Sequence, residues 1–320
     1  MKSGFGVRVL LALVWGSLLS LPAAAAALLY ATGGGSSGLS GLHVVDPVNG
    51  SNTPAWSFNG ISIYAGGLAY DAASDKLFAT GAEVSSTGTS RLFAIDRATG
   101  AVTAYGGLSS FIGLSSGGLA IHPLTGVMYA TGFYNDGVSP HQSTALYTID
   151  KTSGAATLIG FAGGNCCSGD FGLILYGLGF RSDGTLFANG LGNGPSFPVA
   201  HSSHLFTVNL ATGAATNIGP SGVTLGRSLT YSGLAFAADG TLLSLGSLDA
   251  ASGALYVIDP ATGAATSLAA AGLPYGGGPI RFGADGGLTF APAPVPEPAA
   301  VWLFACGLLG VIAAARPRGR

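Results

Sequence analysis

The chain has 320 residues, 54 of which are glycine, and only 8% are Asp, Glu, Lys or Arg, with a formal net charge of −2. This balance supplies no basic surface for nucleic acid, and it excludes the charge-rich kind of disordered protein. The many short apolar runs between glycines predict an all-β protein with abundant turns. Three cysteines are too few for a disulfide scaffold.

The first 27 residues have the layout of a secretory signal peptide. Lys2 and Arg8 form a basic start, an apolar run covers residues 9–21, and alanines follow Pro22. Basic start, apolar core and small-residue cleavage region, in this order, are typical of an exported protein. The apolar run is short for a retained membrane span. We therefore predict a signal peptide at 1–27, with cleavage within residues 25–27.

A short phrase recurs along residues 28–291. Its clearest copy is LYVIDPATGAATSL at residues 255–268, and earlier copies begin at Leu42, Leu92, Leu146 and Leu205. In each complete unit two further strand-like runs precede the phrase, such as GLAF and TLLSLG within residues 233–246. Units of four strands and about fifty residues are the sequence pattern of a β-propeller. The predicted fold class is therefore an all-β propeller of four-stranded blades.

The two ends of this body predict how the ring closes. Residues 28–33 match a second strand, so the first blade lacks its first strand at the N-terminus. A matching run at residues 279–282 is expected to supply it, which seals the ring and leaves no free edge. This reading predicts five blades. Residues 287–290 resemble a leftover second strand and keep a six-bladed ring as the alternative.

The Asp and Gly of the repeated phrase are interpreted as turn chemistry. An Asp or Asn side chain accepts hydrogen bonds from the backbone that follows it, and glycine supplies positive φ. The acceptors are Asp96, Asp150, Asn209 and Asp259, and the glycines are Gly100, Gly154, Gly213 and Gly263. The alternative is a calcium loop, but one carboxylate per turn provides too few oxygen ligands.

The lengths of the connections predict two unlike faces. In every unit the first and third connections are tight, whereas the second connection and the one between blades are long and variable. In an up-and-down blade these two sets lie at opposite ends of the strands. Because binding residues are usually placed on variable loops held by a rigid scaffold, we expect function on the long-loop face.

One candidate on these loops is the run Tyr134, Asn135 and Asp136, which follows Phe133. Aromatic, amide and carboxylate side chains together suit stacking on, and hydrogen bonding to, a sugar. The alternative is a loop that packs its aromatic side chains on a neighbouring blade.

A second candidate is a set of histidines. His201 and His204 lie in one long connection, and His141 lies in the corresponding connection of the preceding unit. Imidazoles are common metal ligands, but a third ligand at a defined spacing is lacking. We predict no metal site and interpret these residues as solvated loop histidines.

A third candidate is the adjacent pair Cys166 and Cys167. In an oxidising compartment two thiols are expected to pair. Neighbouring Cα atoms are about 3.8 Å apart, below the usual range for a disulfide. The pair therefore forms either a strained vicinal disulfide or two free thiols.

The last 29 residues have three parts. Residues 292–298 form a proline-rich linker, residues 299–315 form an uncharged apolar run, and Arg316, Arg318 and Arg320 follow. Seventeen residues of helix are roughly 26 Å long, slightly less than a hydrocarbon core of about 30 Å. We predict a short transmembrane helix at 299–315 with a basic cytoplasmic tail at 316–320.

The order Val295, Pro296, Glu297, Pro298, apolar helix and arginine-rich tail resembles the PEP-CTERM sorting signal. This resemblance implies an exported protein of a Gram-negative bacterium with an exopolysaccharide or biofilm system. It also implies an exosortase as partner, which recognises the Pro-Glu-Pro segment and removes the tail. The body would be periplasmic while the chain is anchored in the inner membrane, and would then reach the cell surface or extracellular matrix. The alternative is an ordinary C-terminal anchor.

Catalytic motifs do not stand out. The chain has no H-E-x-x-H and no P-loop, and Glu83 is the single glutamate of the body. The acids on the variable loops are Asp136, Asp170 and Asp249, and nothing in the sequence pairs two of them as a glycosidase requires. The phrase is similar to quinoprotein-like propeller repeats, which supports the fold alone. We predict no catalytic residues and no cofactor.

These observations favour a non-enzymatic, exported propeller that binds polysaccharide or an envelope protein, with no nucleic-acid partner. The first alternative is a secreted propeller enzyme acting on glycans as a lyase or hydrolase. The second is a purely structural matrix component, whose only specific feature would be the sorting tail.

Overall fold

The computed structural model describes most of one compact unit, residues 27–294, and every structural statement below concerns the described part. The described ranges are 27–35, 40–58, 61–62, 67–83, 90–107, 112–113, 118–135, 140–163, 173–192, 202–222, 233–249, 252–268, 280–281 and 287–293. The signal peptide, the Pro-Glu-Pro motif, the apolar run and the basic tail lie outside them. In these ranges no helix is long and apolar enough to cross a membrane.

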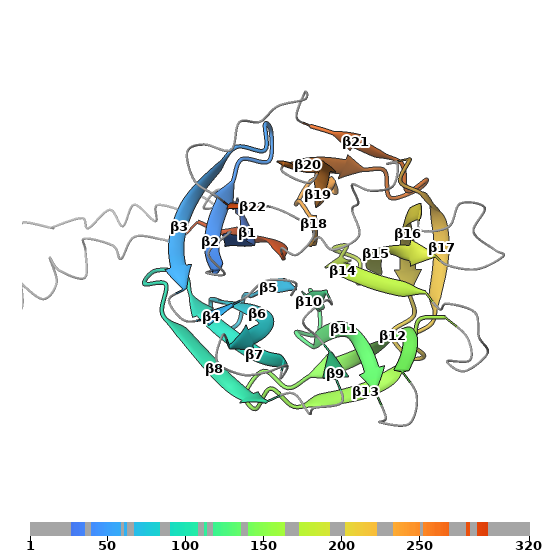
Figure 1. The fold of residues 1–320 in the computed structure, drawn as a ribbon, viewed down its shortest axis with the longest axis horizontal. Coiled ribbons are helices and arrows are strands. Elements are labelled where there is room, and N and C mark those ends of the chain that lie inside the picture. The colour runs from blue at the N-terminus through green and yellow to red at the C-terminus, as the bar shows by residue number, and fades with distance from the viewer. Residues whose placement is uncertain are drawn as a thin grey trace, which may run out of the picture. The chain divides into compact units, whose positions relative to one another are not determined.

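The described elements are β-strands in five antiparallel sheets arranged around a central axis (Figure 1). Each sheet is a blade whose first strand lies nearest the axis. Blade 1 contains β22 (Ile280–Arg281), β23 (Leu288–Pro292), β1 (Ala27–Gly35), β2 (Ser40–Val45) and β3 (Asn52–Phe58). Blade 2 contains β4 (Ile61–Ser62), β5 (Leu68–Asp71), β6 (Lys76–Glu83), β7 (Ser90–Asp96) and β8 (Val102–Gly107). Blade 3 contains β9 (Ile112–Gly113), β10 (Leu119–Ile121), β11 (Met128–Asn135), β12 (Pro140–Ile149) and β13 (Ala156–Phe161). Blade 4 contains β14 (Ile174–Phe180), β15 (Leu186–Gly192), β16 (Ser202–Val208) and β17 (Ala215–Pro220). Blade 5 contains β18 (Leu234–Phe236), β19 (Leu242–Asp249), β20 (Ser252–Ile258) and β21 (Ala265–Ser267).

The innermost strand explains why three sheets contain a fifth, very short strand. In blade 4 the innermost strand is continuous, and β14 pairs with both halves of β15 across a β-bulge. In blades 1, 2 and 3 the same strand is divided, so β22, β4 and β9 pair only with the far ends of β1, β6 and β11. Each blade therefore has four strand positions, as the sequence predicted.

Closure of the ring corrects one sequence assignment. Residues 279–282 were expected to be the whole missing first strand, and residues 287–290 to be left over. Instead, Leu288–Pro292 is the innermost strand of blade 1 and pairs with residues 27–31, while Ile280–Arg281 pairs with residues 34–35. Both runs belong to one divided strand position. The ring therefore has five blades, and the six-bladed alternative is excluded.

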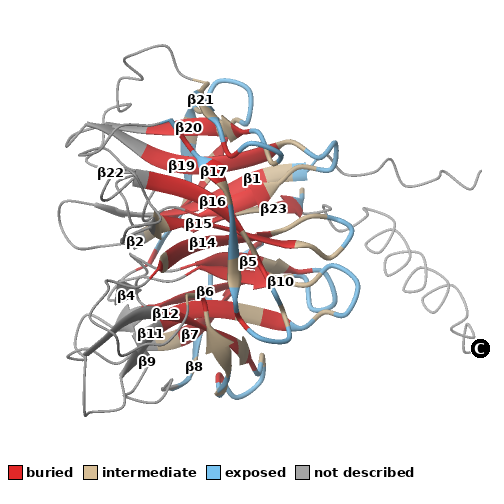
Figure 2. Cartoon of the chain, turned by 90° about the vertical axis from the view of Figure 1, so that its right-hand side faces the viewer, coloured by how far each residue is buried: buried red, intermediate tan, exposed pale blue. Residues whose placement is uncertain are grey.

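The core lies between the blades. Figure 2 shows buried strands across the body and exposed turns at one end of them. The leucines that open the repeated phrase are all fully buried, namely Leu42, Leu92, Leu146, Leu205 and Leu255. Each buried leucine contributes about 1.5–3 kcal/mol relative to full exposure. The repeated phrase thus places one core side chain in every blade.

A hydrogen-bonded clamp joins the first two strands of most blades. In blade 2 the N–H of Gly67 donates to Thr80 Oγ1 at 2.9 Å, and the N–H of Thr80 donates to the Gly67 carbonyl at 3.2 Å. Blades 1 and 3 use Thr32 and Thr131 in the same way. Asn189 replaces threonine in blade 4, and its Oδ1 accepts the N–H of Gly177 at 2.7 Å. The repeated Ala-Thr-Gly or Ala-Asn-Gly of the second strand therefore satisfies buried backbone groups.

Glycines let the innermost strands meet backbone to backbone. A Cβ built on Gly67 would lie 2.0 Å from the backbone nitrogen of Leu119 in blade 3, and one on Gly233 would lie 2.0 Å from that of Leu288 in blade 1. Gly118, Gly179 and Gly287 make the corresponding approaches at the other three interfaces. Glycine is therefore required at every blade interface beside the axis.

Candidate functional site

The tight turns have the chemistry predicted for them. In blade 2, Asp96 Oδ1 accepts the N–H groups of Ala98 and Thr99 at 2.9 and 2.8 Å, and Gly100 has φ of 72°. These hydrogen bonds hold the pKa of Asp96 below its ordinary value. Asp150, Asn209 and Asp259 make equivalent bonds, so the turn interpretation is confirmed. Within the described ranges no group of three or more His, Cys, Asp or Glu is placed to hold a metal ion.

A cavity of about 440 Å³ lies between the innermost strands, at the end where the first connections of blades 2 and 3 turn. Its walls are the innermost strands of all five blades, and the first-connection residues Ala72, Pro123 and Gly126 form part of its rim. The sequence predicts function at the opposite end of the strands, on the long loops. Those loops fall largely outside the described ranges, whereas the cavity is lined by described residues.

The wall of the cavity includes an apolar collar, one residue from each innermost strand. The collar consists of Tyr70, Ile121, Phe180, Phe236 and Phe290, and each is half-buried. Contacts behind the collar hold two members in place: the ring centroid of Phe236 lies 5.2 Å from that of Phe187, and that of Phe180 lies 5.6 Å from that of Tyr129. The collar therefore presents preformed aromatic surface.

Asp71 and His122 follow the collar residues of blades 2 and 3 and also line the cavity. Asp71 is 4% exposed; its Oδ1 accepts a hydrogen bond from Lys151 Nζ of blade 3 at 2.8 Å, and its Oδ2 accepts one from Ser74 Oγ at 2.6 Å. Burial alone would raise the pKa of Asp71, but these two partners outweigh burial and lower it. Asp71 is therefore an ionised carboxylate across the interface of blades 2 and 3.

His122 has a defined tautomer. Its Nδ1 accepts the backbone N–H groups of Leu124 and Thr125 at 3.1 and 3.3 Å. A neutral imidazole that accepts at Nδ1 carries its proton on Nε2. The ring centroid lies 4.9 Å from that of Phe180. His122 Nε2 lies beside the turn of blade 4, where a Cβ built on Gly184 would come within 2.9 Å of it.

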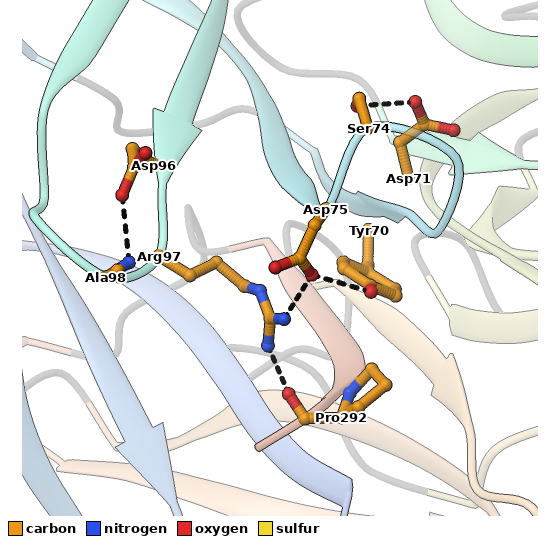
Figure 3. Close-up of polar contacts among 8 residues, drawn as sticks. All are labelled: Tyr70, Asp71, Ser74, Asp75, Asp96, Arg97, Ala98 and Pro292. Atoms are coloured by element: carbon orange, nitrogen blue, oxygen red, sulfur yellow. Dashed lines mark hydrogen bonds and ion pairs between the residues drawn. The ribbon is translucent and has the colours of Figure 1, made fainter. Parts of the chain in front are cut away.

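A second polar cluster surrounds Arg97, at the boundary of blades 1 and 2 (Figure 3). The guanidinium of Arg97 donates to the carbonyl of Pro292 in blade 1 and to Asp75 Oδ1, and it lies 4.9 Å from the ring centroid of Tyr70. Burial and the hydrogen bond that the Tyr70 hydroxyl donates to Asp75 raise the pKa of Tyr70. The cluster joins the C-terminal strand of the body to a turn 195 positions earlier in the chain.

The described structure places only some of the residues proposed from sequence. Tyr134 and Asn135 were expected in a loop, but they end strand β11, opposite Ile112 and Pro140. His141 lies in β12. Asp136, His201, Cys166 and Cys167 lie outside the described residues. The disulfide hypothesis and the sugar-binding role of this run therefore stay predictions.

His204 also differs from expectation. It was predicted in a loop, but it lies in β16, is 5% exposed, and its Nδ1 is 3.1 Å from Asn217 Oδ1 on the neighbouring strand. Burial lowers its pKa, although the contact with Asn217 acts in the opposite direction. His204 is a buried strand residue rather than a solvated one.

The cavity residues escaped the sequence analysis although their signal is regular. Each collar residue stands third after the leading glycine of its unit, as in Gly67-Leu-Ala-Tyr70 and Gly233-Leu-Ala-Phe236. Alternation along the four strands of a unit does not by itself reveal which strand faces the axis. Once the first strand is known to be innermost, the five positions become one ring.

No protein-family model matches the chain, and no curated protein sequence matches it. Solved structures similar to it include an exo-β-1,3-galactanase from Clostridium thermocellum, with 11% identity, a TM-score of 0.47 and coverage of 63% of this chain and 48% of that one. Another is the periplasmic gluconolactonase of Pseudomonas aeruginosa, with 14% identity, a TM-score of 0.44 and coverage of 75% and 82%. The chain thus spans about half the length of the galactanase. Similarity at this level says nothing about activity or ligand.

Proposed function

We propose that this chain is an exported protein, sorted by an exosortase to the cell surface or extracellular matrix, whose propeller binds polysaccharide or an envelope protein without catalysing a reaction. The observation that carries the sorting part is the order Val295, Pro296, Glu297, Pro298, apolar run and terminal arginines. An apolar run of seventeen residues next to basic residues suits a temporary inner-membrane anchor.

The geometry of the channel supports binding over catalysis. Asp71 is the carboxylate that lines the cavity within the described ranges, and Lys151 and Ser74 hold it ionised. A general acid must keep its proton near the working pH, which needs a raised pKa rather than a lowered one. Asp71 is therefore suited to hold a ligand, and poorly suited to protonate a leaving group.

The sorting proposal is tested by mass spectrometry of the protein recovered from a host with and without a working exosortase. We expect cleavage near residues 25–27 in both hosts and loss of the segment after Pro298 only when the exosortase works. A variant with Pro296→Ala and Glu297→Ala should stay uncleaved in the membrane fraction, while Val48→Ala, on an exposed turn, serves as the matched control. Cleavage of the double variant to the same extent as the wild type would contradict the proposal.

The binding proposal is tested with arrays of matrix polysaccharides and with envelope-protein extracts, using the full chain in detergent. Retention on one class of ligand supports it. A protein that is sorted correctly yet binds neither class would instead be a structural matrix component.

A further inference from the structure

The cavity at the tight-turn end of the channel has two unlike walls. Blades 2 and 3 contribute Asp71 and His122, whereas blades 4, 5 and 1 contribute Phe180, Phe236 and Phe290. One side of a bound molecule would thus meet aromatic rings, and the other side would meet hydrogen-bonding groups. Such a division between an apolar surface and a few oriented polar groups is typical of small-molecule sites.

The polar wall retains hydrogen-bonding capacity. A carboxylate has about four lone-pair sites, and Lys151, Ser74 and the backbone N–H of Ala73 occupy three of those of Asp71. The remaining site can accept one hydroxyl proton from a ligand. His122 is the second polar side chain of this wall, and its Nε2 lies beside Gly184 of blade 4. The wall can therefore bind a ligand hydroxyl through Asp71.

The charge of the cavity wall restricts the class of ligand that the cavity can bind. Asp71 is the one side chain with a formal charge among the described residues that line the cavity. Lys151 balances its charge at 2.8 Å, so an incoming carboxylate or phosphate would lose its hydration without meeting an unpaired cation among the described residues that line the cavity. A neutral polyhydroxylated ring meets no such penalty. Its C–H face packs on aromatic rings, while one of its hydroxyls reaches the carboxylate.

We propose that this cavity binds a neutral sugar ring at the end of a polysaccharide chain, with its C–H face against Phe236 and Phe290 and one of its hydroxyls on Asp71. The cavity volume of about 440 Å³ lies within the usual range for small-ligand sites. The proposal rests on the binding role proposed above, and it assigns that role to the tight-turn end of the channel rather than to the long loops.

The first test fills the cavity. Thr289 lines it on blade 1, and Thr289→Trp adds a large ring there without removing Asp71 or the collar. The matched control is Thr266→Trp, on the exposed face of the outermost strand of blade 5. Titration calorimetry with neutral oligosaccharides should show at least about tenfold weaker binding for Thr289→Trp and unchanged binding for the control. Thermal unfolding of each variant confirms that it is folded.

The second test changes charge without changing shape. Asp71→Asn should weaken binding of neutral sugars and raise the affinity for uronic-acid oligosaccharides relative to neutral ones. A purely structural role for Asp71 would lower thermal stability and leave this preference unchanged. The selectivity readout keeps the proposal testable even if Thr289→Trp fails to fold.

The outcomes separate the two proposals. If the wild-type chain binds a saccharide and folded Thr289→Trp binds it equally well, the ligand lies elsewhere and this inference is overturned, while the proposed function stands. If the wild-type chain binds no saccharide on the array, both the cavity assignment and the polysaccharide part of the proposed function are overturned.

Discussion

The interface between blades 1 and 2 and the interface between blades 4 and 5 solve the same packing problem by different means. Between blades 4 and 5, Gly219 approaches the carbonyl oxygen of Thr262, and the N–H of Ala265 donates to the Ser221 carbonyl at 2.9 Å. Between blades 1 and 2, Trp56 occupies the place of that glycine, covers Gly100, and donates from Nε1 to the Arg97 carbonyl at 3.3 Å.

The turn residue after each Asp or Asn shows the same division. In blade 2 it is Arg97, which reaches the Pro292 carbonyl, and in blade 3 it is Lys151, which pairs with Asp71. In blade 4 it is Leu210, which packs against the apolar cluster between blades 3 and 4. In blade 5 it is Pro260. Charged side chains therefore join the two interfaces on either side of blade 2, whereas the turn residues of blades 1, 4 and 5 are Pro47, Leu210 and Pro260.

The Arg97 contacts lie where the ring is closed without a covalent connection. Blade 1 combines β23 from the C-terminal end of the body with β1 from its N-terminal end, so no covalent connection inside the blade holds these strands together. Side chains that reach the last residue of β23 compensate for that missing connection. Blades 2 to 5 are each continuous in sequence, so ring closure accounts for the Arg97 contact but not for the Lys151–Asp71 pair.

The largest expected effect is at the backbone interface of blades 4 and 5. In Gly219→Ala the new Cβ would lie 2.2 Å from the Thr262 carbonyl oxygen, so the backbone must move. We expect a loss of about 3 kcal/mol in the free energy of unfolding. The matched control is Gly240→Ala, which has φ of 89° but open space, and should lose about 1–2 kcal/mol from backbone strain alone. Equal losses in denaturant titrations would contradict the close-approach argument.

The next effect is at the stapled interface. Arg97→Met keeps most of the buried stem but leaves the Pro292 carbonyl and Asp75 without their cation. Because Asp75 is 65% exposed and partly solvated, we expect a moderate loss of about 2 kcal/mol. Arg181→Met removes an exposed arginine paired with Asp183 and should leave the unfolding midpoint unchanged. A similar midpoint for both variants would show that the staple contributes nothing.

A smaller effect, dependent on pH, is expected at the interface of blades 2 and 3. The pKa of Asp71 is lower in the folded protein than in the unfolded chain, so its ion pair stabilises the fold above about pH 4 and this contribution is lost as the pH falls further. Asp71→Asn should cost about 1 kcal/mol at pH 7. The difference in melting temperature from the wild type should shrink below pH 4, and a constant difference would contradict this origin.

The smallest effect distinguishes a core histidine from the charged staples. Burial lowers the pKa of His43, so protonation favours the unfolded chain and wild-type stability falls as the pH drops below about 6.5. His43 stands where other units have Phe93, Tyr147, Phe206 and Tyr256. The melting temperature of His43→Phe relative to that of the wild type should therefore rise as the pH falls from 7 to 5. A difference in melting temperature between variant and wild type that stays constant across that range would refute the prediction.

Local features were predictable because neighbouring residues determine them. The turns after Asp96, Asp150, Asn209 and Asp259 depend on a side chain that bonds to the backbone two or three residues later. The four-strand unit depends on alternation and spacing over about fifty residues. Both patterns are complete within one stretch of sequence, and the structure confirms both.

The candidate site was harder to predict because its parts come from all five units. The collar takes one residue from each innermost strand, and Asp71 faces Lys151 eighty positions later. The divided first strand also misled the closure argument, since residues 280–281 and 288–292 fill one strand position with a gap between them. Periodicity detects neither relation.

The sequence alone determined the blade repeat, the chemistry of the tight turns, and the export and sorting hypotheses, because each depends on residues close together in the chain. The tertiary structure decided which strand closes the ring, that Arg97 staples Pro292, and that a two-walled cavity forms at the turn end of the channel. These features exist only after distant strands meet, when closure brings groups nearly two hundred residues apart to hydrogen-bonding distance.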